Sequence, residues 1–289
     1  MYTLFFDTDC DITPEVAKHY GAKLISMPYA INGEEVFPYV DFDTYDAHAF
    51  MDSLRKGALP TTSALPPAVY SHYFEPELKK GNDVLYIHFS RAMSATFDNV
   101  DAAIKELKGK YPDRRIELID TKGITLGSYS ICKQLGDLYL QGKSIDEIKA
   151  LSSEIINKTA FYFFADNLKF FARSGRVSGF SAFMGGVIGV KPIINISDEG
   201  KMVSVNKAIG RKAALDKILS YVIDLQDNIK KYPVVIAHGD AMHLVETFSA
   251  MLRQKFGQDL NIEVIDINPT AGSHCGPDTL GVTFHAKHR

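Results

Sequence analysis

Short apolar runs that alternate with segments of helical character constrain the fold of this chain most strongly. Residues 2–6, 84–89 and 116–119 are apolar runs of strand length, and a polar residue follows each of them. Residues 94–107, between two of these runs, carry apolar side chains at helical spacing. Strands separated by helices are typical of a mostly parallel sheet with helices on both faces.

Local signals support this alternation. Thr13-Pro14-Glu15 combines a capping residue, a proline at the first helical position and an acid in the first turn, so a helix should begin there. Ser144 and Glu147 have the spacing of a capping box. Asn32-Gly33 predicts a tight turn between two strands.

The sequence pattern changes near residue 157, and the second half of the chain again mixes strands and helices. Strands are predicted at 161–164, 234–238 and 262–267, with a helix at 211–225. We therefore expect an α/β protein of two lobes, residues 1–157 and 158–289, each a mostly parallel sheet flanked by helices.

Composition limits the classes of function. With 46% hydrophobic residues the chain can bury a large core, and a net charge of -3 without a dense basic run argues against a nucleic-acid binder. Cys10, Cys132 and Cys275 match no metal or disulfide spacing, which suits a reducing compartment. The start of the chain lacks the pattern of a signal peptide, and no apolar run is long enough for a membrane span, so we expect a cytoplasmic protein.

Hydroxyl side chains mark two candidate anion sites. Thr62 and Ser63 lie in a loop between prolines, and Ser94 and Thr96 open a predicted helix just after a strand. Ligands of doubly wound sheets bind where strands end, and a helix N-terminus suits an anion. The simpler alternative is that Ser94 only caps its helix.

Carboxylates and basic residues permit further interpretations. Asp7, Asp9 and Asp11 occupy alternate positions, so their carboxylates could together bind a hard cation. An Asp-rich turn after a first strand is, however, more often a capping device than a metal site. Five basic residues flank apolar or glycine-rich segments, and they form either an electropositive rim or separate solvated charges. They are Arg173, Arg176, Lys191, Arg211 and His274.

Residues 179–190 mix glycine with Phe and Met, a composition that fits the wall of an acyl-chain tunnel and fits a packed core about as well. Motifs for catalysis are missing: the sequence has no G-x-S-x-G elbow, no phosphate-binding loop and no dinucleotide fingerprint. Cys275 is adjacent to His274, but sequence neighbours rarely form a catalytic couple.

Taken in order, these features resemble the motifs of the DegV family of bacterial lipid-binding proteins over about residues 3 to 285. The resemblance rests on the acidic segment at 7–11, Thr62-Ser63, Ser94-Ala95-Thr96, the stretch 168–177, Lys191-Pro192-Ile193, Arg211, and the closing segment 274–278.

The resemblance implies that one long-chain fatty acid lies in a tunnel between the lobes. Hydroxyls would hold its carboxylate, with Thr62 and Ser94 as the main ligands and Ser63 and Thr96 beside them. Family members of this kind present the fatty acid to an ATP-dependent fatty acid kinase, which forms an acyl phosphate for phospholipid synthesis. The expected protein is therefore a carrier with no catalytic residue, metal or cofactor of its own. The residues expected near the head group or the kinase are Arg176, Arg211 and His274.

Three positions depart from the family pattern: Ala95 and Ser174 replace glycines, and Asp278 replaces the last glycine of the closing motif. A carboxylate at Asp278 would repel an anionic head group unless it points away or pairs with an arginine. Two alternatives to the carrier stay open. One is a phosphotransferase-like enzyme that uses the acidic loop on a small phosphorylated metabolite, and the other is a lipid sensor without a kinase partner.

Overall fold

The computed structural model describes residues 1–178 and 189–289. The predicted tunnel wall at 179–190 therefore lies, except for its last two residues, outside the described residues. Within the described ranges no helix combines the length and the apolar character that crossing a membrane requires.

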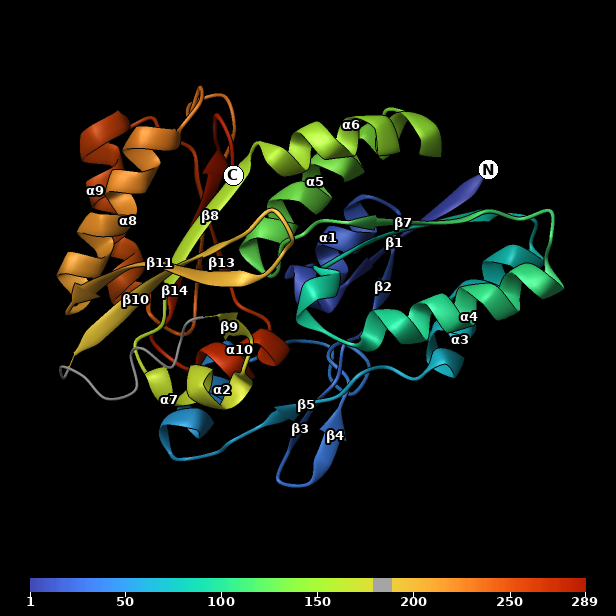
Figure 1. Ribbon diagram of the computed structural model, residues 1–289, viewed down its shortest axis with the longest axis horizontal. Helices are drawn as coiled ribbons and strands as arrows, with labels where there is room; N and C mark the ends of the chain where they lie inside the picture. The colour runs from blue at the N-terminus through green and yellow to red at the C-terminus, as the bar shows by residue number, and fades with distance from the viewer. Residues whose placement is uncertain (179–188) are drawn as a thin grey trace.

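A four-stranded parallel sheet forms the N-terminal part, as predicted (Figure 1). Its order is β2-β1-β6-β7, and its apolar strands are buried because helices cover it; the ring of Phe5 packs edge-on against Phe74 of a flanking helix. The elements of this part are β1 (Tyr2–Asp7), η1 (Thr8–Cys10), α1 (Pro14–His19), β2 (Lys23–Ile25), α3 (Pro67–Lys79), β6 (Asp83–His88), η2 (Arg91–Met93), α4 (Thr96–Lys110) and β7 (Ile116–Asp120).

The second sheet has seven strands in the order β13-β12-β14-β8-β10-β11-β9, and it is mixed. Four of its six described pairings are antiparallel, so the prediction of a mostly parallel second sheet is wrong. The last strand of the chain causes much of the difference, because β14 inserts between β12 and β8 and runs against both. The strands are β8 (Thr159–Phe164), β9 (Val177–Ser178), β10 (Val190–Ile196), β11 (Met202–Ile209), β12 (Val234–His238), β13 (Ile262–Asp266) and β14 (Leu280–His285).

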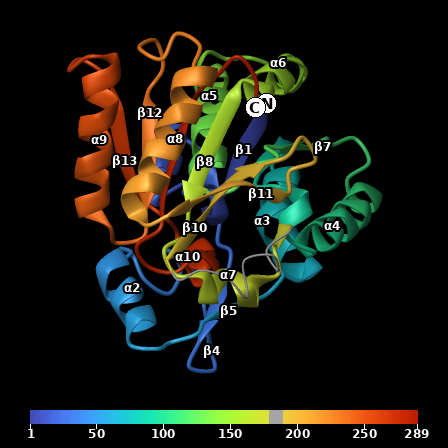
Figure 2. The ribbon, with the colours of Figure 1, turned by 60° about the vertical axis from the view of Figure 1, so that its left-hand side comes forward.

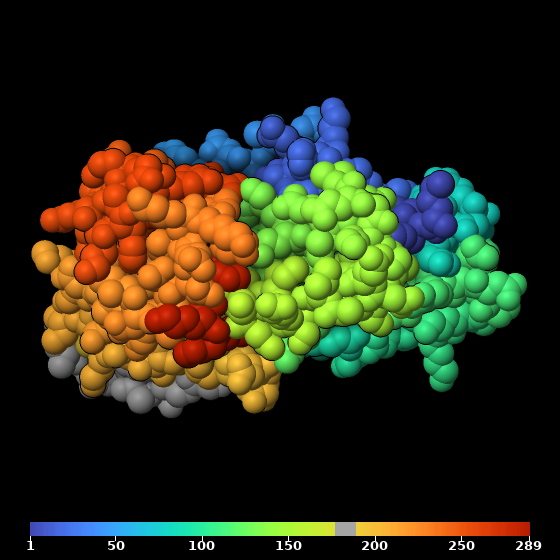
Figure 3. All heavy atoms as spheres, turned by 90° about the horizontal axis from the view of Figure 1, so that it is seen from above, coloured from blue at the N-terminus to red at the C-terminus, as the bar shows by residue number. Residues whose placement is uncertain are grey.

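Helices lie on both faces of the mixed sheet. Figure 2 shows α8 (Arg211–Leu225) and α9 (Met242–Phe256) on its outer face. On the inner side α5 (Leu126–Leu140) contacts strands of both sheets, and α6 (Ile145–Asn157) follows it. Seen from the α6 end, residues of this helix form the surface between the N-terminal and C-terminal parts (Figure 3).

A small antiparallel sheet has three short strands, β3 (Tyr29–Ile31), β4 (Glu34–Val36) and β5 (Thr61–Thr62), of which the sequence predicts the pair on either side of Asn32-Gly33 but not β5. The turn at Asn32-Gly33 is confirmed, and both residues have positive φ. Together with α2 (Ala47–Arg55) this sheet packs on α10 (Pro269–Cys275), close to α7 (Leu168–Ser174) (Figure 1). Residues from early in the chain therefore border residues from its end, where the hydroxyl candidates lie.

The hydrophobic core is continuous across the two large sheets. One cluster joins Phe5 and Phe97 to Phe163 and Ala237, and a second lies between the mixed sheet and its outer helices. The division of the chain at residue 157 stays a prediction.

Candidate functional site

A pocket lies between the two large sheets, at the carboxyl ends of β1 and β6, and we call it the central pocket. It encloses about 880 Å³ of space between atoms, its open mouth included. Most of its wall is apolar: Met27, Phe89, Met93, Ile124, Leu126, Phe163, Met202, Ala237, Ile267, Ala271 and Gly281.

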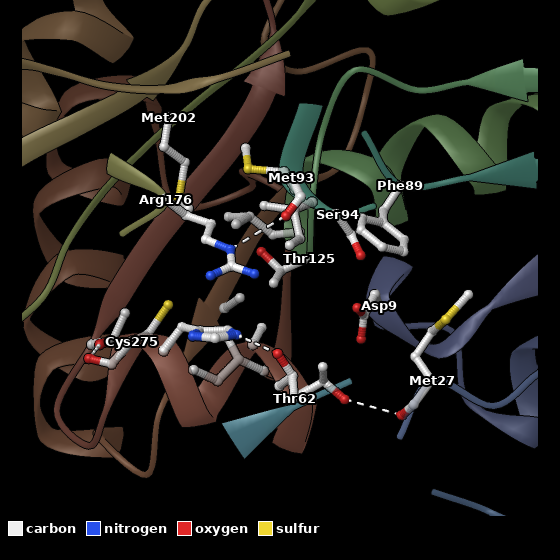
Figure 4. A pocket seen from close by; sticks show the side chains of 18 of the residues that line it. Asp9, Met27, Thr62, Phe89, Met93, Ser94, Thr125, Arg176, Met202 and Cys275 are labelled. Carbon is white, nitrogen blue, oxygen red and sulfur yellow. Dashed lines mark hydrogen bonds between the residues drawn. The ribbon is translucent and has the colours of Figure 1, made fainter. Parts of the chain in front are cut away.

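Polar groups converge on one region of this pocket. In Figure 4 the side chains of Thr62, Ser94, Thr125 and Arg176 direct their polar ends toward one common space. They come from β5, from the segment after η2, from the start of α5 and from the segment after α7. Six of the seven residues predicted for the site line this pocket: Thr62, Ser63, Ser94, Thr96, Arg176 and His274.

Thr62 and His274 form a hydrogen-bonded pair, with Thr62 Oγ1 3.0 Å from His274 Nε2. Burial lowers the pKa of His274 to about 4, and the charges of Arg176 and Arg173 contribute in the same direction. The imidazole is therefore neutral at pH 7 and acts as a hydrogen-bonding group.

The backbone before Arg176 directs its side chain. Gly175 ends α7 in the left-handed conformation, and the Arg176 amide then donates to the Ser174 hydroxyl. The guanidinium donates through Nη1 to the Ser174 carbonyl at 2.6 Å and through Nε to the Met93 carbonyl at 3.5 Å. Ser174, one of the three departures from the family pattern, is buried and helps to hold the arginine.

The structure corrects the start of α4. The helix begins at Thr96, because the short η2 helix occupies residues 91–93 and Ala95 takes the capping position. The Ser94 hydroxyl accepts a bond from the Thr96 amide at 3.2 Å and still lines the pocket.

Two of the predicted hydroxyls, those of Thr96 and Ser63, form hydrogen bonds that hold parts of the protein together. Thr96 Oγ1 accepts from the Leu65 amide and lies 2.7 Å from the Tyr70 hydroxyl, so it fastens the 60–65 loop to α4. Ser63 donates to the Glu35 carboxylate at 2.6 Å. Thr62 and Ser94 also have partners, His274 and the Thr96 amide, but their hydroxyls are directed into the common space of the pocket (Figure 4), so among the predicted hydroxyls they are the ones best placed to meet a ligand.

Arg211 lies elsewhere and does not line the central pocket. Its guanidinium pairs with Asp166 at 2.9 Å and with Asp278 at 3.1 Å, and Asp278 also pairs with Arg55. The Asp278 carboxylate is thus paired with two arginines. A carboxylate that is paired in this way does not repel an anionic head group as an unpaired one would. Lys191 pairs with Asp166 at 2.8 Å and belongs to the same surface network.

The three aspartates of the first loop are buried. Asp7 caps η1 by accepting from the Cys10 amide, so the capping interpretation is confirmed for Asp7. Asp11 instead accepts from the amide and side chain of Asn268 and ties the first loop to the start of α10. Among the described residues no group of three His, Cys, Asp or Glu side chains is placed to hold a metal ion.

Asp9 is the exception, because it lines the central pocket and its Oδ1 atom has no hydrogen-bond partner among the described residues. In Figure 4 its carboxyl lies between Phe89 and Met27. Burial raises its pKa well above the ordinary value, and the charges of Asp7 and Asp11 add to the effect. A neutral carboxyl group here does not repel an anion.

Sequence reasoning also missed Thr125. It lines the pocket with φ 49° and ψ -130°, a conformation that a β-branched residue rarely adopts, and its amide donates to the Asp9 carbonyl. Backbone strain of this kind gathers at ligand sites. Only the position of Thr125 after a strand could have suggested it.

Cys275 is the one cysteine on the pocket wall. Burial raises the pKa of its thiol to about 12, so the thiol stays protonated at pH 7 and is a poor nucleophile.

Comparisons with known proteins agree with the fold. The chain is 32% identical over 284 residues to a DegV domain-containing protein of Clostridium perfringens, which covers 98% of this chain and 97% of the relative. A DegV domain-containing protein of Streptococcus pyogenes is 26% identical over 284 residues, with 97% and 96% covered.

Solved structures superpose over nearly the whole chain. A DegV family protein from Thermus thermophilus, described by its fatty acid binding, has a TM-score of 0.85 at 22% identity, with 99% of both chains covered. A stearic acid-binding protein from Eubacterium ventriosum has a TM-score of 0.86 at 18% identity, also with 99% of both chains covered. The family model described as "Uncharacterised protein, DegV family" matches residues 2–287, and the chain belongs to the DegV family.

Proposed function

We propose that this protein binds one long-chain fatty acid in the central pocket. The observation that carries the proposal is the distribution of polarity: one convergent polar region in a pocket whose remaining wall is mostly apolar. An amphiphile with a single anionic head matches that distribution, whereas a small phosphorylated metabolite would leave part of its polar surface without hydrogen bonds against the apolar wall.

The carboxylate is placed between Thr62 and Ser94, within reach of the Arg176 guanidinium. Hydroxyls and a guanidinium are donors to a carboxylate, and a buried carboxylate without donors would be severely destabilised. His274 orients the Thr62 hydroxyl through their shared hydrogen bond. Because His274 is neutral, Arg176 supplies the positive charge that attracts the head group.

The acyl chain supplies most of the affinity. Each buried CH₂ group contributes about 0.8 kcal/mol, so a long chain outweighs any single head-group bond. Met27, Met93 and Met202 on the wall suit this ligand, since methionine adapts to chains of different shape. Solved relatives described as fatty-acid binding proteins support the choice of ligand.

The protein acts as a carrier and not as an enzyme. It presents the fatty acid carboxylate to a separate kinase, which transfers a phosphoryl group from ATP to a carboxylate oxygen and releases ADP. The acyl phosphate then enters phospholipid synthesis in the cytoplasm. The partly exposed network of Arg211, Arg55 and Asp278 offers charged groups for contact with such a partner.

Organic extraction of the purified protein, followed by mass spectrometry, tests the proposal. We expect a near-stoichiometric fatty acid, and delipidated protein should take up added oleate or stearate with saturation. If the protein carries no fatty acid and takes up neither lipid, the proposed ligand is wrong while the fold stands.

A further inference from the structure

Thr125 carries a hydroxyl that the protein itself does not use. Seven serine and threonine residues of the described chain line the central pocket. Six of them have hydrogen bonds to other protein groups: Thr62, Ser63, Ser94, Thr96, Thr270 and Thr279. The hydroxyl of Thr125 has no such bond among the described residues, so its whole hydrogen-bonding capacity is left for a ligand.

The hydroxyl of Thr125 is enclosed by the protein and still faces the pocket. The residue is only 6% exposed. In Figure 4 its oxygen is directed toward the space that Thr62, Ser94 and Arg176 also face. The oxygen does not belong to the fully covered side-chain atoms that lack a partner, so it keeps surface that a ligand can touch. Because buried polar groups almost always have a partner, a hydroxyl in this setting indicates that a ligand supplies one.

The simpler role of Thr125, as a cap of α5, is not fulfilled. Thr125 occupies the capping position of this helix, but its side chain makes no capping hydrogen bond. A capping threonine has extended backbone angles and accepts a bond from an amide two or three residues further on. Thr125 has φ 49° and ψ -130° instead, and these angles turn its side chain away from that role.

The strained backbone of Thr125 is held by the structure around it. Its amide donates to the Asp9 carbonyl at 2.8 Å, which fixes the turn to the first loop. Thr121 Oγ1 lies 2.8 Å from Ser128 Oγ and closes the turn from the other side. Strained conformations persist only where the surroundings determine them, and they gather at ligand sites. The turn therefore keeps a destabilising conformation that directs one hydroxyl into the pocket.

We propose that Thr125 is a head-group ligand and makes the pocket prefer a free carboxylate over an alcohol of the same chain length. The inference rests on the proposed function, because it assigns a further donor to the fatty acid in the central pocket. A carboxylate has two oxygens with about four acceptor sites, so the donors Thr62, Ser94 and Arg176 leave room for another. Hydrogen bonds to a charged acceptor are about twice as strong as those between neutral groups. An uncharged alcohol head group gains less from the same hydroxyl.

Displacement of a fluorescent fatty-acid probe from the delipidated full chain, by stearate and by octadecanol, tests the proposal. Thr125→Val keeps the shape and the β-branching but removes the hydroxyl. Its affinity for stearate should fall by about tenfold to a hundredfold, the effect of one lost hydrogen bond to a charged group. Its affinity for octadecanol should fall much less. Thr125→Ser brings the hydroxyl back and should recover most of the affinity for stearate.

Thr247→Val is the matched control, because it makes the same change on the exposed side of α9, where the hydroxyl bonds the His243 carbonyl. It should bind both ligands as the wild type does. The proposal is overturned if Thr125→Val binds stearate normally. It is also overturned if this variant loses affinity for stearate and octadecanol equally, since an equal loss indicates a purely structural role. A wild type that binds no stearate would overturn the proposed function itself, and this inference with it.

Thermal unfolding of Thr125→Gly tests the strain separately. Glycine tolerates a positive φ without strain, and this variant lacks the hydroxyl as Thr125→Val does. Both variants should bind stearate weakly, but Thr125→Gly should unfold at a higher temperature than Thr125→Val. A lower unfolding temperature for Thr125→Gly would contradict the strain, and with it the argument that the turn is built for the ligand.

Discussion

Thr62 Oγ1 and His274 Nε2 lie 3.0 Å apart although 212 positions separate them in the chain. The contact exists because β5 and α10 pack together, which places the start of the chain against its end. The pair holds one hydroxyl at the polar region of the central pocket, and the predictions for the ligand follow from it.

Removal of both head-group hydroxyls should weaken fatty acid binding. In Thr62→Ala/Ser94→Ala each lost hydrogen bond to a charged group costs about 1.5–3 kcal/mol, so the loss in affinity should exceed tenfold while the fold stays intact. Fluorescence displacement of a bound fatty-acid probe measures it. Ser220→Ala, on the outer helix α8, is the matched control. Unchanged affinity in the double variant would contradict the head-group assignment.

Arg176→Ala should separate binding from phosphoryl transfer. The acyl chain still supplies most of the affinity in this variant, whereas the carboxylate loses the cation beside it. With a fatty acid kinase and ATP, acyl phosphate formation should fall more than fatty acid affinity does. An equal loss in both measurements would show that Arg176 serves only to hold the ligand.

Asp9→Asn should stabilise the protein at alkaline pH. The pKa of Asp9 is raised in the folded chain, so its contribution to stability is complete below the unfolded pKa of about 3.9 and is lost as pH rises through the folded pKa. The neutral amide avoids this loss, which is worth about 1.4 kcal/mol per pKa unit. Urea unfolding should therefore give a higher free energy of unfolding for the variant at pH 8 and equal values near pH 4.

The control for this experiment is Asp113→Asn, on the exposed turn before β7, where the free energy of unfolding should follow the wild type at both pH values. A lower stability of Asp9→Asn at pH 8 would mean that the carboxylate is ionised and paired in the folded protein.

Gly127→Ala should destabilise the contact between α5 and β8. A Cβ atom at this position would lie 2.4 Å from the Phe161 ring, and such overpacking costs about 1–3 kcal/mol. Gly109→Ala is the matched control, because nothing lies within 4 Å of its Cβ position and alanine favours a helix by about 0.5–1 kcal/mol. Thermal unfolding should move in opposite directions for the two variants, and a stabilised Gly127→Ala would contradict the close packing.

Local sequence signals determined much of the secondary structure. Thr13 and Pro14 begin α1, Ser144 and Glu147 form the capping box of α6, and the parallel strands β1, β6 and β7 contain short, mainly apolar runs. Caps and periodicity act over one or two turns, so they can be read from neighbouring residues. The order of the motifs along the chain also sufficed to indicate the family, which the family model over residues 2–287 confirms.

Only the tertiary structure decided the sheet order and the final site. The direction of β14 depends on where the last strand finds an open edge between β12 and β8, and nothing within that strand specifies it. Long-range contacts likewise gave Thr96 and Ser63 protein partners, drew Arg211 to Asp278 and left Asp9 Oδ1 at the pocket wall without a partner among the described residues. A side chain's residue type thus sets which bonds it can make, while packing between distant segments decides which partners it meets.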